Sequence, residues 1–258
     1  MGRVVSPNDV FYNYSPWAMF RPAEVLTQNS TMNDPPTAYF TLMTLARNDW
    51  RTFHWNPYIA SGIPGFGSSA SAILSPFILL PVLLVPLAWI YTAILFLKLN
   101  ASFLFAYLWL REERLGRTGA AVGAIVIAGA GVYAVRWLWQ ITNATVLYPA
   151  LLWIVRRTMN GKRTSIVIVT SIALAYALAG FPAAMAYGAW VAAAYVVFLW
   201  LRGIRKRWLW PPHSKTVITG VVLALMMALP SLVPFVQFLK RSGYLEMRQG
   251  ASLVSVFP

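Results

Sequence analysis

Apolar and polar positions divide the chain into a polar, turn-rich first quarter and a series of long apolar runs. The clearest of these runs lie at residues 88–110, 118–138, 142–155, 164–181, 184–201 and 216–236. A helix needs about 20 mostly apolar residues to cross a bilayer, and most of the runs reach or approach that length. The pattern predicts an all-α multi-span membrane protein, in which residues 88–239 form a transmembrane bundle of about six helices.

A further apolar stretch, residues 72–87, carries Pro76, Pro81 and Pro86. Proline at every fifth position disfavours a straight helix, because each ring removes a backbone donor and clashes with the preceding turn. We therefore expect a short, broken interfacial or re-entrant segment. The alternative makes residues 72–90 and 92–110 two separate spans. It is the weaker interpretation, because no turn-forming loop lies between the two runs.

Cations gather in three clusters between the apolar runs, at Arg111–Arg117, Arg156–Arg163 and Arg202–Lys215. They follow the first, third and fifth runs, so all three fall on one side of the membrane. Cytoplasmic loops carry an excess of Lys and Arg, which assigns this side to the cytoplasm. Residues 1–87 and the final segment, residues 240–258, are then extracytoplasmic. The alternative with an additional span would place residues 1–70 in the cytoplasm instead.

The polar residues 1–70 contain many aromatic, proline and glycine residues. A disordered segment is poor in aromatic residues, so we interpret this region as a large ordered external loop with short helices around residues 36–47. The chain shows no segment that would carry an extracytoplasmic N-terminus across the membrane. We therefore expect the natural protein to have a further apolar helix before residue 1 and further spans after Pro258.

Composition narrows the possible chemistry. Hydrophobic residues make up 59% of the chain and charged residues 11%, whereas a soluble domain carries roughly 25% charged residues. The net charge is +14, but its cations lie between apolar runs, so we do not expect a nucleic-acid partner. With no cysteine, two histidines and seven acids, we expect neither disulfides nor a bound metal, and we predict no cofactor.

Three short motifs follow one another in the polar region: D-P-P-x-x-Y-F from Asp34, W-N-P-Y from Trp55 and G-I-P from Gly62. Together they resemble the first external loop of the YfhO-like bacterial membrane proteins, which belong to the GT-C superfamily of glycosyltransferases. The later G-F-P turn at Gly180 is similar to a G-aromatic-P turn of that family. The chain departs from the family at Thr41, which begins a Thr-Leu pair where the family usually has Pro-Trp.

The resemblance implies a GT-C-like helix bundle with a large external N-terminal loop, in the bacterial cytoplasmic membrane. It also implies a polyprenyl-phosphate-linked sugar as donor, and an envelope polymer or lipid as acceptor. In such enzymes an external Asp acts as general base. Asp34 precedes the W-N-P element at the family's spacing, and Asp9 competes because it heads its own D…P-W pattern. The alternative is that both acids only cap short helices.

Lys98 lies inside the first span, where an ionisable residue is costly and is by default a functional candidate. The resemblance suggests that it holds the donor phosphate, with Arg136 as a second phosphate or sugar contact. Alternatively, Lys98 extends to the membrane surface and Arg136 is an interfacial anchor. Trp55, Asn56 and His54 are candidates for binding sugar.

Three functions remain open from the sequence. The first is a glycosyltransferase that transfers a lipid-linked sugar to an extracytoplasmic acceptor, and it needs an external acid near the membrane. The second is a lipid or polymer transporter or flippase, which needs broken helices and polar residues near the membrane midplane. The third is a non-catalytic membrane partner of an envelope-assembly complex. The sequence favours the first.

Overall fold

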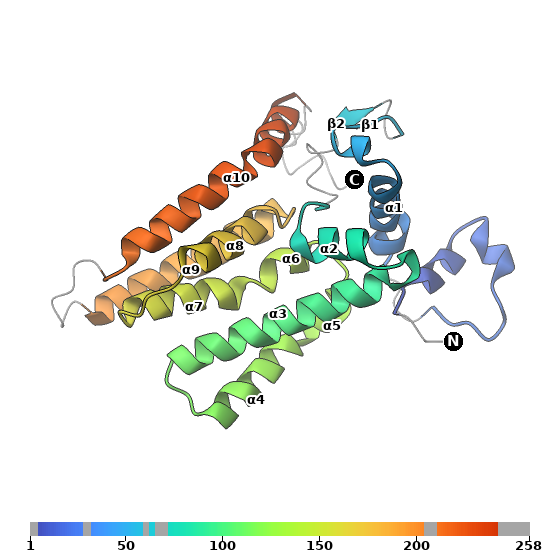
Figure 1. The fold of residues 1–258 in the computed structure, drawn as a ribbon. Helices are drawn as coiled ribbons and strands as arrows, with labels where there is room; N and C mark the ends of the chain where they lie inside the picture. Colours follow the sequence, from blue (N-terminus) through green and yellow to red (C-terminus); the bar gives the residue numbers. More distant parts are fainter. Residues whose placement is uncertain (1–4, 28–31, 59–61, 65–71, 204–210, 242–258) are drawn as a thin grey trace, which may run out of the picture.

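The computed structural model describes residues 5–27, 32–58, 62–64, 72–203 and 211–241, and helices dominate this part of the chain (Figure 1). The α-helices are α1 (Phe40–Asn48), α2 (Pro76–Leu84), α3 (Ile90–Glu112), α4 (Arg117–Ala128), α5 (Gly131–Arg136), α6 (Ile141–Thr145), α7 (Tyr148–Met159), α8 (Ile166–Ala177), α9 (Pro182–Gly203) and α10 (Ser214–Arg241). The short helical turns are η1 (Asn8–Asn13), η2 (Trp17–Phe20), η3 (Pro35–Tyr39), η4 (Trp50–Phe53) and η6 (Leu87–Trp89). The strands β1 (Trp55–Asn56) and β2 (Ile63–Pro64) form a two-residue antiparallel ladder.

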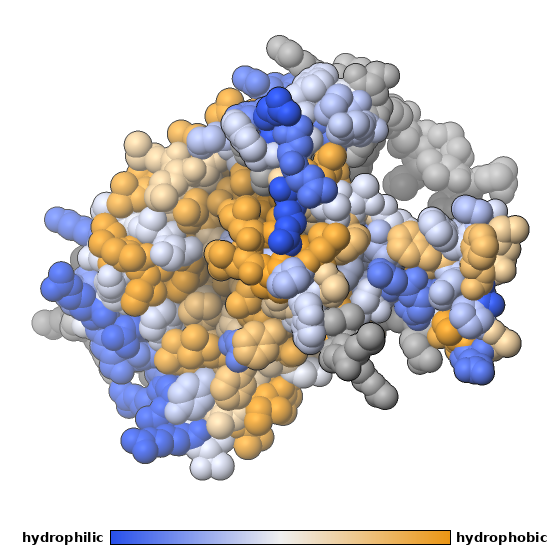
Figure 2. Space-filling model, turned by 45° about the vertical axis from the view of Figure 1, so that its right-hand side comes forward, coloured by the Kyte–Doolittle hydropathy of each residue, from blue (hydrophilic) through white to orange (hydrophobic). Residues whose placement is uncertain are grey.

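Three helices in the described residues are long and apolar enough to cross a membrane: Leu87–Glu112, Pro182–Arg202 and Ser214–Lys240. Their outer faces carry large apolar side chains, and Trp190 on α9 is 74% exposed. Figure 2 shows hydrophobic side chains over much of the helical bundle, with hydrophilic ones gathered along its lower left edge. A soluble monomer rarely exposes so much contiguous apolar surface, so this bundle fits a lipid environment.

The second and third apolar runs are interrupted, unlike the single helices that their hydropathy suggests. The second run forms α4 and α5, separated at Gly129 and Ala130, where Ala130 adopts an extended backbone. Glycine on both sides of Ala130 lowers the helix propensity there. The third run forms α6 and α7, and Pro149 lies in the first turn of α7, a position where proline starts a helix.

Residues 72–87 form a short broken segment, as their prolines predict. Helix α2 has nine residues, which at 1.5 Å per residue extend about 14 Å, less than half of a hydrocarbon core of about 30 Å. Pro76 lies at its start and Pro81 inside it, and the chain is extended again at Val85. Because α2 is too short to cross a bilayer, the alternative with a separate span at residues 72–90 finds no support in the structure.

The bundle is assembled around α3, which packs against α4 and α7, while α7 packs against α9 and α8 against α10. One apolar core cluster lies among these helices and includes Val146, Leu147, Trp153 and Val169. A second cluster joins α1 and α2 to the first turns of α3 through Met43, Ile78, Tyr91 and Ile94. The N-terminal region is therefore anchored to one end of α3, as Figure 1 shows.

The described part of the N-terminal region contains the short helices expected near residues 36–47, now seen as η3 followed by α1. At the other end of the chain, α10 continues to Arg241. The expected external segment at residues 240–258 therefore overlaps the last two residues of this helix. Its remainder, residues 242–258, lies outside the described residues.

The sidedness of the bundle can be tested by single-cysteine labelling, since the chain has no cysteine of its own. Glu24 is exposed in the N-terminal region, and Arg163 is exposed in a basic loop at the other end of the bundle. We expect Glu24→Cys in intact cells to react with a membrane-impermeant maleimide, and Arg163→Cys to react only after permeabilisation. The reverse labelling pattern would place the N-terminal region in the cytoplasm.

Candidate functional site

Asp34 lies at the start of the helical segment formed by η3 and α1, but its carboxylate does not cap that helix. The next two residues, Pro35 and Pro36, have no backbone N–H to donate, and the first following donor, the Thr37 amide, bonds to the Asn33 carbonyl at 3.1 Å. The Asp34 carboxylate therefore accepts no capping hydrogen bond from the helix backbone. The simple helix-cap interpretation of this acid does not fit its contacts.

The Asp34 carboxylate is instead hydrogen-bonded to the side chain of Tyr39, one turn further along the same segment. Burial raises the pKa of Tyr39 to about 12, and the negative charge of Asp34 and the hydrogen bond between them act in the same direction. Tyr39 therefore stays protonated at neutral pH and donates to the carboxylate. A donated O–H bond orients the carboxylate.

A second tyrosine fixes this segment to the bundle. The Tyr91 hydroxyl, in the first turn of α3, donates to the backbone carbonyl of Pro35. The rings of Tyr91 and Phe40 lie 5.4 Å apart. Tyr91 is buried, so these contacts hold the half-buried Asp34 at the end of α3 that carries the N-terminal region.

The competing acid, Asp9, is also partly buried and lies in η1, which packs against η3. Its backbone carbonyl accepts a hydrogen bond from the Thr27 hydroxyl at 3.4 Å, and its neighbour Val10 is fully buried. The structure thus brings the elements that carry Asp9 and Asp34 together. Ion pairs among the described residues involve Asp49, Glu112 and Glu113 and do not include Asp34.

Lys98 is fully buried, and its ammonium group is surrounded by acceptors from one neighbouring segment. It donates to the carbonyls of Trp137 at 2.9 Å and Trp139 at 3.1 Å, and to the Thr142 hydroxyl at 2.9 Å. A lysine has three protons to donate, and all three are used here. Lys98 can therefore contact a donor phosphate only by giving up one of these bonds, and it does not extend to the membrane surface.

Arg136 lies at the end of α5, directly before the segment that Lys98 holds. Its side chain is exposed, and its guanidinium carbon lies 6.0 Å from the centre of the Trp139 ring. This is a weak cation–π contact that leaves the guanidinium protons accessible. Of the two predicted phosphate contacts, Arg136 is the one whose cationic group can reach a ligand without rearrangement.

The W-N-P…G-x-P motif forms the small hairpin of β1 and β2, in which Trp55 pairs with Pro64 and Asn56 with Ile63. Asn56 is 4% exposed, and its side-chain oxygen accepts from the Tyr58 amide at 3.0 Å. It supports the turn and is poorly placed to bind sugar. Trp55 is 54% exposed, so part of its side chain is accessible to a ligand.

Gly62 explains why this motif requires a glycine. Its φ is +111°, a conformation that L side chains rarely adopt, and a Cβ atom there would overlap the Trp55 indole. We expect Gly62→Val to disrupt the hairpin, with a strain of about 1–3 kcal/mol. Limited proteolysis of the purified protein should then show faster cleavage within residues 50–65. An unchanged rate would show that the Trp55–Gly62 contact does not hold the hairpin.

His54, the third candidate for sugar binding, is exposed in the same region. Its ring lies edge-on to Trp50, with the ring centres 5.9 Å apart. Among the described residues, no group of three or more His, Asp or Glu side chains is arranged to hold a metal ion. The structure places His54 and Trp55 side by side on the hairpin.

Two residues of this region were not identified from the sequence. Tyr91 is one of many aromatic residues near the ends of apolar runs, and nothing in its spacing marks its bond to Pro35. Thr142 completes the shell around Lys98, and its only sequence signal is a polar residue within a short apolar run. Both contacts join segments more than 40 positions apart, which local patterns do not encode.

Comparisons of the chain with models of protein families, with curated proteins and with solved structures find no match. Its function is therefore inferred from the arrangement of its own residues.

Proposed function

We propose that the protein is a membrane glycosyltransferase that moves a sugar from a polyprenyl-phosphate carrier to an extracytoplasmic acceptor of the bacterial cell envelope. The observation that carries this proposal is the Asp34 carboxylate. It is half-buried, bonded to Tyr39 and fixed to the end of α3 by the Tyr91–Pro35 contact. It lies at the end of the bundle opposite the basic loops, where a lipid carrier would present its sugar on the outer face.

In the proposed reaction, Asp34 accepts the proton of the acceptor hydroxyl as that oxygen attacks the anomeric carbon. The bond between the anomeric carbon and the phosphate oxygen breaks, and the polyprenyl phosphate leaves with the bonding electrons. A positioned carboxylate contributes as general base when it lies within hydrogen-bond reach of the hydroxyl. Tyr39 orients the carboxylate, and Asp9 on the adjacent η1 is the competing base.

The leaving phosphate gains negative charge, and cations near it stabilise the transition state. Arg136 has an exposed guanidinium group suited to this role, since guanidinium pairs with phosphate through parallel N–H bonds. Lys98 acts indirectly in this proposal, because its three bonds hold the Trp137–Thr142 segment that follows Arg136. Trp55 and His54 on the hairpin are the aromatic groups proposed to contact sugar.

The proposal is tested by supplying the purified full chain, in proteoliposomes, with radiolabelled polyprenyl-phosphate sugars and an envelope lipid extract as acceptor. Transfer of label from the carrier to the extract, with release of polyprenyl phosphate, supports the proposal. Liposomes that contain denatured protein are the control. No transfer from any donor in a panel of hexose and pentose carriers would contradict it.

A lipid or polymer transporter is the second candidate, and one structural feature favours it. Helices are interrupted between α4 and α5 and again between α6 and α7, and the acceptors around buried Lys98 come from residues 137–142, which lie between these two interruptions. Transporters bind their substrates at such interruptions near the midplane. Movement of fluorescent lipid across the same proteoliposomes, without sugar transfer, would favour this candidate. If neither activity is found, the third hypothesis remains, in which the protein is a non-catalytic membrane partner of an envelope-assembly complex.

A further inference from the structure

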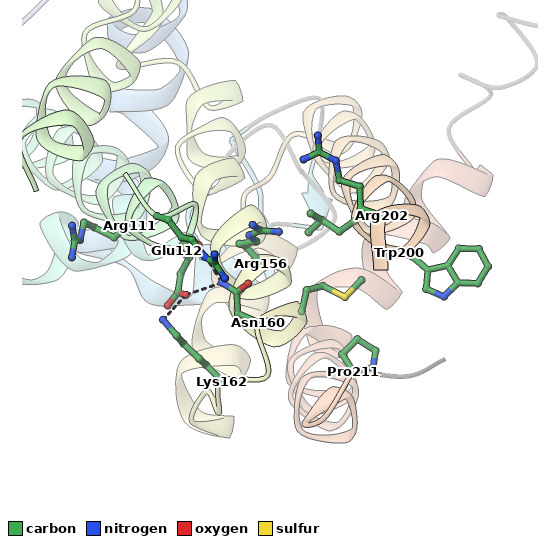
Figure 3. A pocket seen from close by; sticks show the side chains of 11 residues that line it. Arg111, Glu112, Arg156, Asn160, Lys162, Trp200, Arg202 and Pro211 are labelled. Atoms are coloured by element: carbon green, nitrogen blue, oxygen red, sulfur yellow. Dashed lines mark hydrogen bonds and ion pairs between the residues drawn. The ribbon is translucent and has the colours of Figure 1, made fainter. Parts of the chain in front are cut away.

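A basic cavity of about 460 Å³ lies at the far end of α3 from Asp34, where α3, α7 and α9 approach the basic loops (Figure 3). It is lined by Arg111, Glu112, Arg114, Arg156, Met159, Asn160, Lys162, Leu199, Trp200, Arg202 and Pro211. Five of these lining residues are Arg or Lys and one is acidic, within the part of the chain that the structure describes. The positive-inside rule assigns this end to the cytoplasm.

The acids near the cavity are already paired by contacts within the protein. Glu112 is buried and accepts from Arg157 at 2.7 Å, Lys162 at 2.9 Å and Asn160 at 3.2 Å. Glu113 pairs with Arg156 at 3.2 Å. These pairs order the walls of the cavity, but they neutralise only part of its positive charge.

Arg111, Arg114 and Arg202 are the exposed lining cations that make no ion pair among the described residues, and Arg111 donates to the Leu115 carbonyl at 2.9 Å. Arg202 lies over the Phe198 ring, with its guanidinium carbon 4.5 Å from the ring centre, a contact that leaves its positive charge in place. The Nε of Arg156 is buried and has no hydrogen-bond partner among the described atoms. Figure 3 shows Arg156 between Glu112 of α3 and Arg202 of α9. A buried guanidinium donor without an acceptor indicates that this cavity can take an anion.

An apolar groove of about 550 Å³ adjoins the basic cavity between α7, α9 and α10. Its lining residues are Val155, Thr158, Met159, Val196, Trp200, Pro211, Ser214, Val217 and Ile218. Met159, Trp200 and Pro211 line both spaces, so the groove and the cavity share a wall. The cationic cavity matches the charged headgroup of a phospholipid, and the adjoining apolar groove matches its acyl chains.

We propose that the basic cavity and the apolar groove together form a binding site for an anionic phospholipid of the cytoplasmic leaflet. The headgroup phosphate pairs with Arg156 and Arg202, and an acyl chain lies in the groove between α7, α9 and α10. Basic pockets between membrane helices on the cytoplasmic side suit anionic headgroups. A free anion would use only the cavity, whereas a lipid accounts for the groove as well. The site is independent of the proposed transfer reaction, which lies at the other end of α3.

Native mass spectrometry of the detergent-solubilised full chain tests this proposal. The probes are phosphatidylglycerol and phosphatidylcholine with identical acyl chains, added at equal concentrations. We expect phosphatidylglycerol to bind at least about tenfold more tightly, as charge-assisted phosphate pairs would provide. Equal binding of the two lipids would overturn the proposal.

A matched pair of double variants locates the site. The double variant Arg114→Gln/Arg202→Gln is expected to lose most of the preference for phosphatidylglycerol. The control Arg117→Gln/Arg163→Gln removes the same charge from exposed positions outside the cavity and should keep it. Arg114 and Arg202 make no ion pair among the described contacts, so the first variant is expected to fold, and Arg202→Gln alone serves if it does not. An equal loss in both double variants would leave only a general surface charge and overturn the site.

The groove is tested by filling it. Val196→Trp places a bulky ring in the groove and should weaken phosphatidylglycerol binding by about tenfold, while Val222→Trp, on the exposed face of α10, should not. A competition experiment with inorganic phosphate tests whether the cavity binds a free anion instead of a lipid. If millimolar phosphate displaces the lipid completely and Val196→Trp has no effect, the cavity binds a free anion and the lipid proposal fails.

Discussion

Replacing Asp34 with Asn is expected to reduce sugar transfer by about 10²–10⁴-fold, the usual contribution of a general base. The amide has the size and shape of the carboxylate but cannot accept the acceptor's proton. Tyr39 can still donate to the amide oxygen, and the Tyr91–Pro35 bond is untouched. The variant should therefore fold and reach the membrane normally. Initial rates in the proteoliposome assay, normalised to protein, measure the effect.

Two other acids serve as controls for this variant. Asp49 lies in the same region, with its side chain 35% exposed, and pairs with the exposed Arg51 at 3.0 Å. Asp49→Asn should leave transfer within about twofold of wild type, since ion pairs near the surface contribute little. Asp9→Asn distinguishes the two candidate bases, because η1 packs against η3. If Asp9→Asn abolishes transfer while Asp34→Asn retains it, the base is Asp9. If both variants retain full transfer, the general-base proposal fails.

Replacing Lys98 with Met is expected to destabilise the protein by about 1–3 kcal/mol, the range for leaving buried polar groups without a partner. Methionine fills much of the same volume but leaves the Trp137 and Trp139 carbonyls without their ammonium donor. Removing a buried charge also removes its desolvation cost, which limits the loss. Thermal unfolding in detergent, followed by tryptophan fluorescence, should show a Tm lower by roughly 5 °C.

The same variant distinguishes the two roles suggested for Lys98. A structural role predicts a lower Tm whether or not donor lipid is present. Lys215→Met is the matched control, because Lys215 is exposed at the start of α10, and it should leave the Tm unchanged. If Lys98→Met keeps the wild-type Tm and instead raises the KM for the donor, Lys98 contacts the phosphate directly.

Hydropathy alone located the long helices well, because a span must keep nearly every position apolar and that requirement is visible locally. The runs near residues 88–110, 184–201 and 216–236 correspond to α3, α9 and α10. Hydropathy overlooked the interruption at Gly129 and Ala130, because the chain is mostly apolar on both sides of it. It also overlooked the break between α6 and α7, just before Pro149. Hydropathy averaged over a window of residues cannot distinguish one long helix from two short helices in a row.

The candidate site was predictable only in part. The sequence identified Asp34 and the motif that contains Tyr39, but only the structure showed that the two side chains interact. It also identified the W-N-P…G-x-P motif, but as part of the sugar site. In the structure, Asn56 and Gly62 serve the hairpin turn itself, and Trp55 remains accessible.

The sequence by itself determined that the chain is helical and apolar enough for a membrane, where its cations cluster, and where proline breaks its helices. Each of these properties depends on neighbouring residues and on the bilayer or water around them. Only the tertiary structure decided that the Lys98 protons are used by carbonyls about 40 positions away. It also decided that Tyr91 fixes the Asp34 segment, and that Arg156 and Arg202 line one cavity. These pairings depend on how helices pack, and packing geometry brings together residues whose separation in sequence carries no periodic signal.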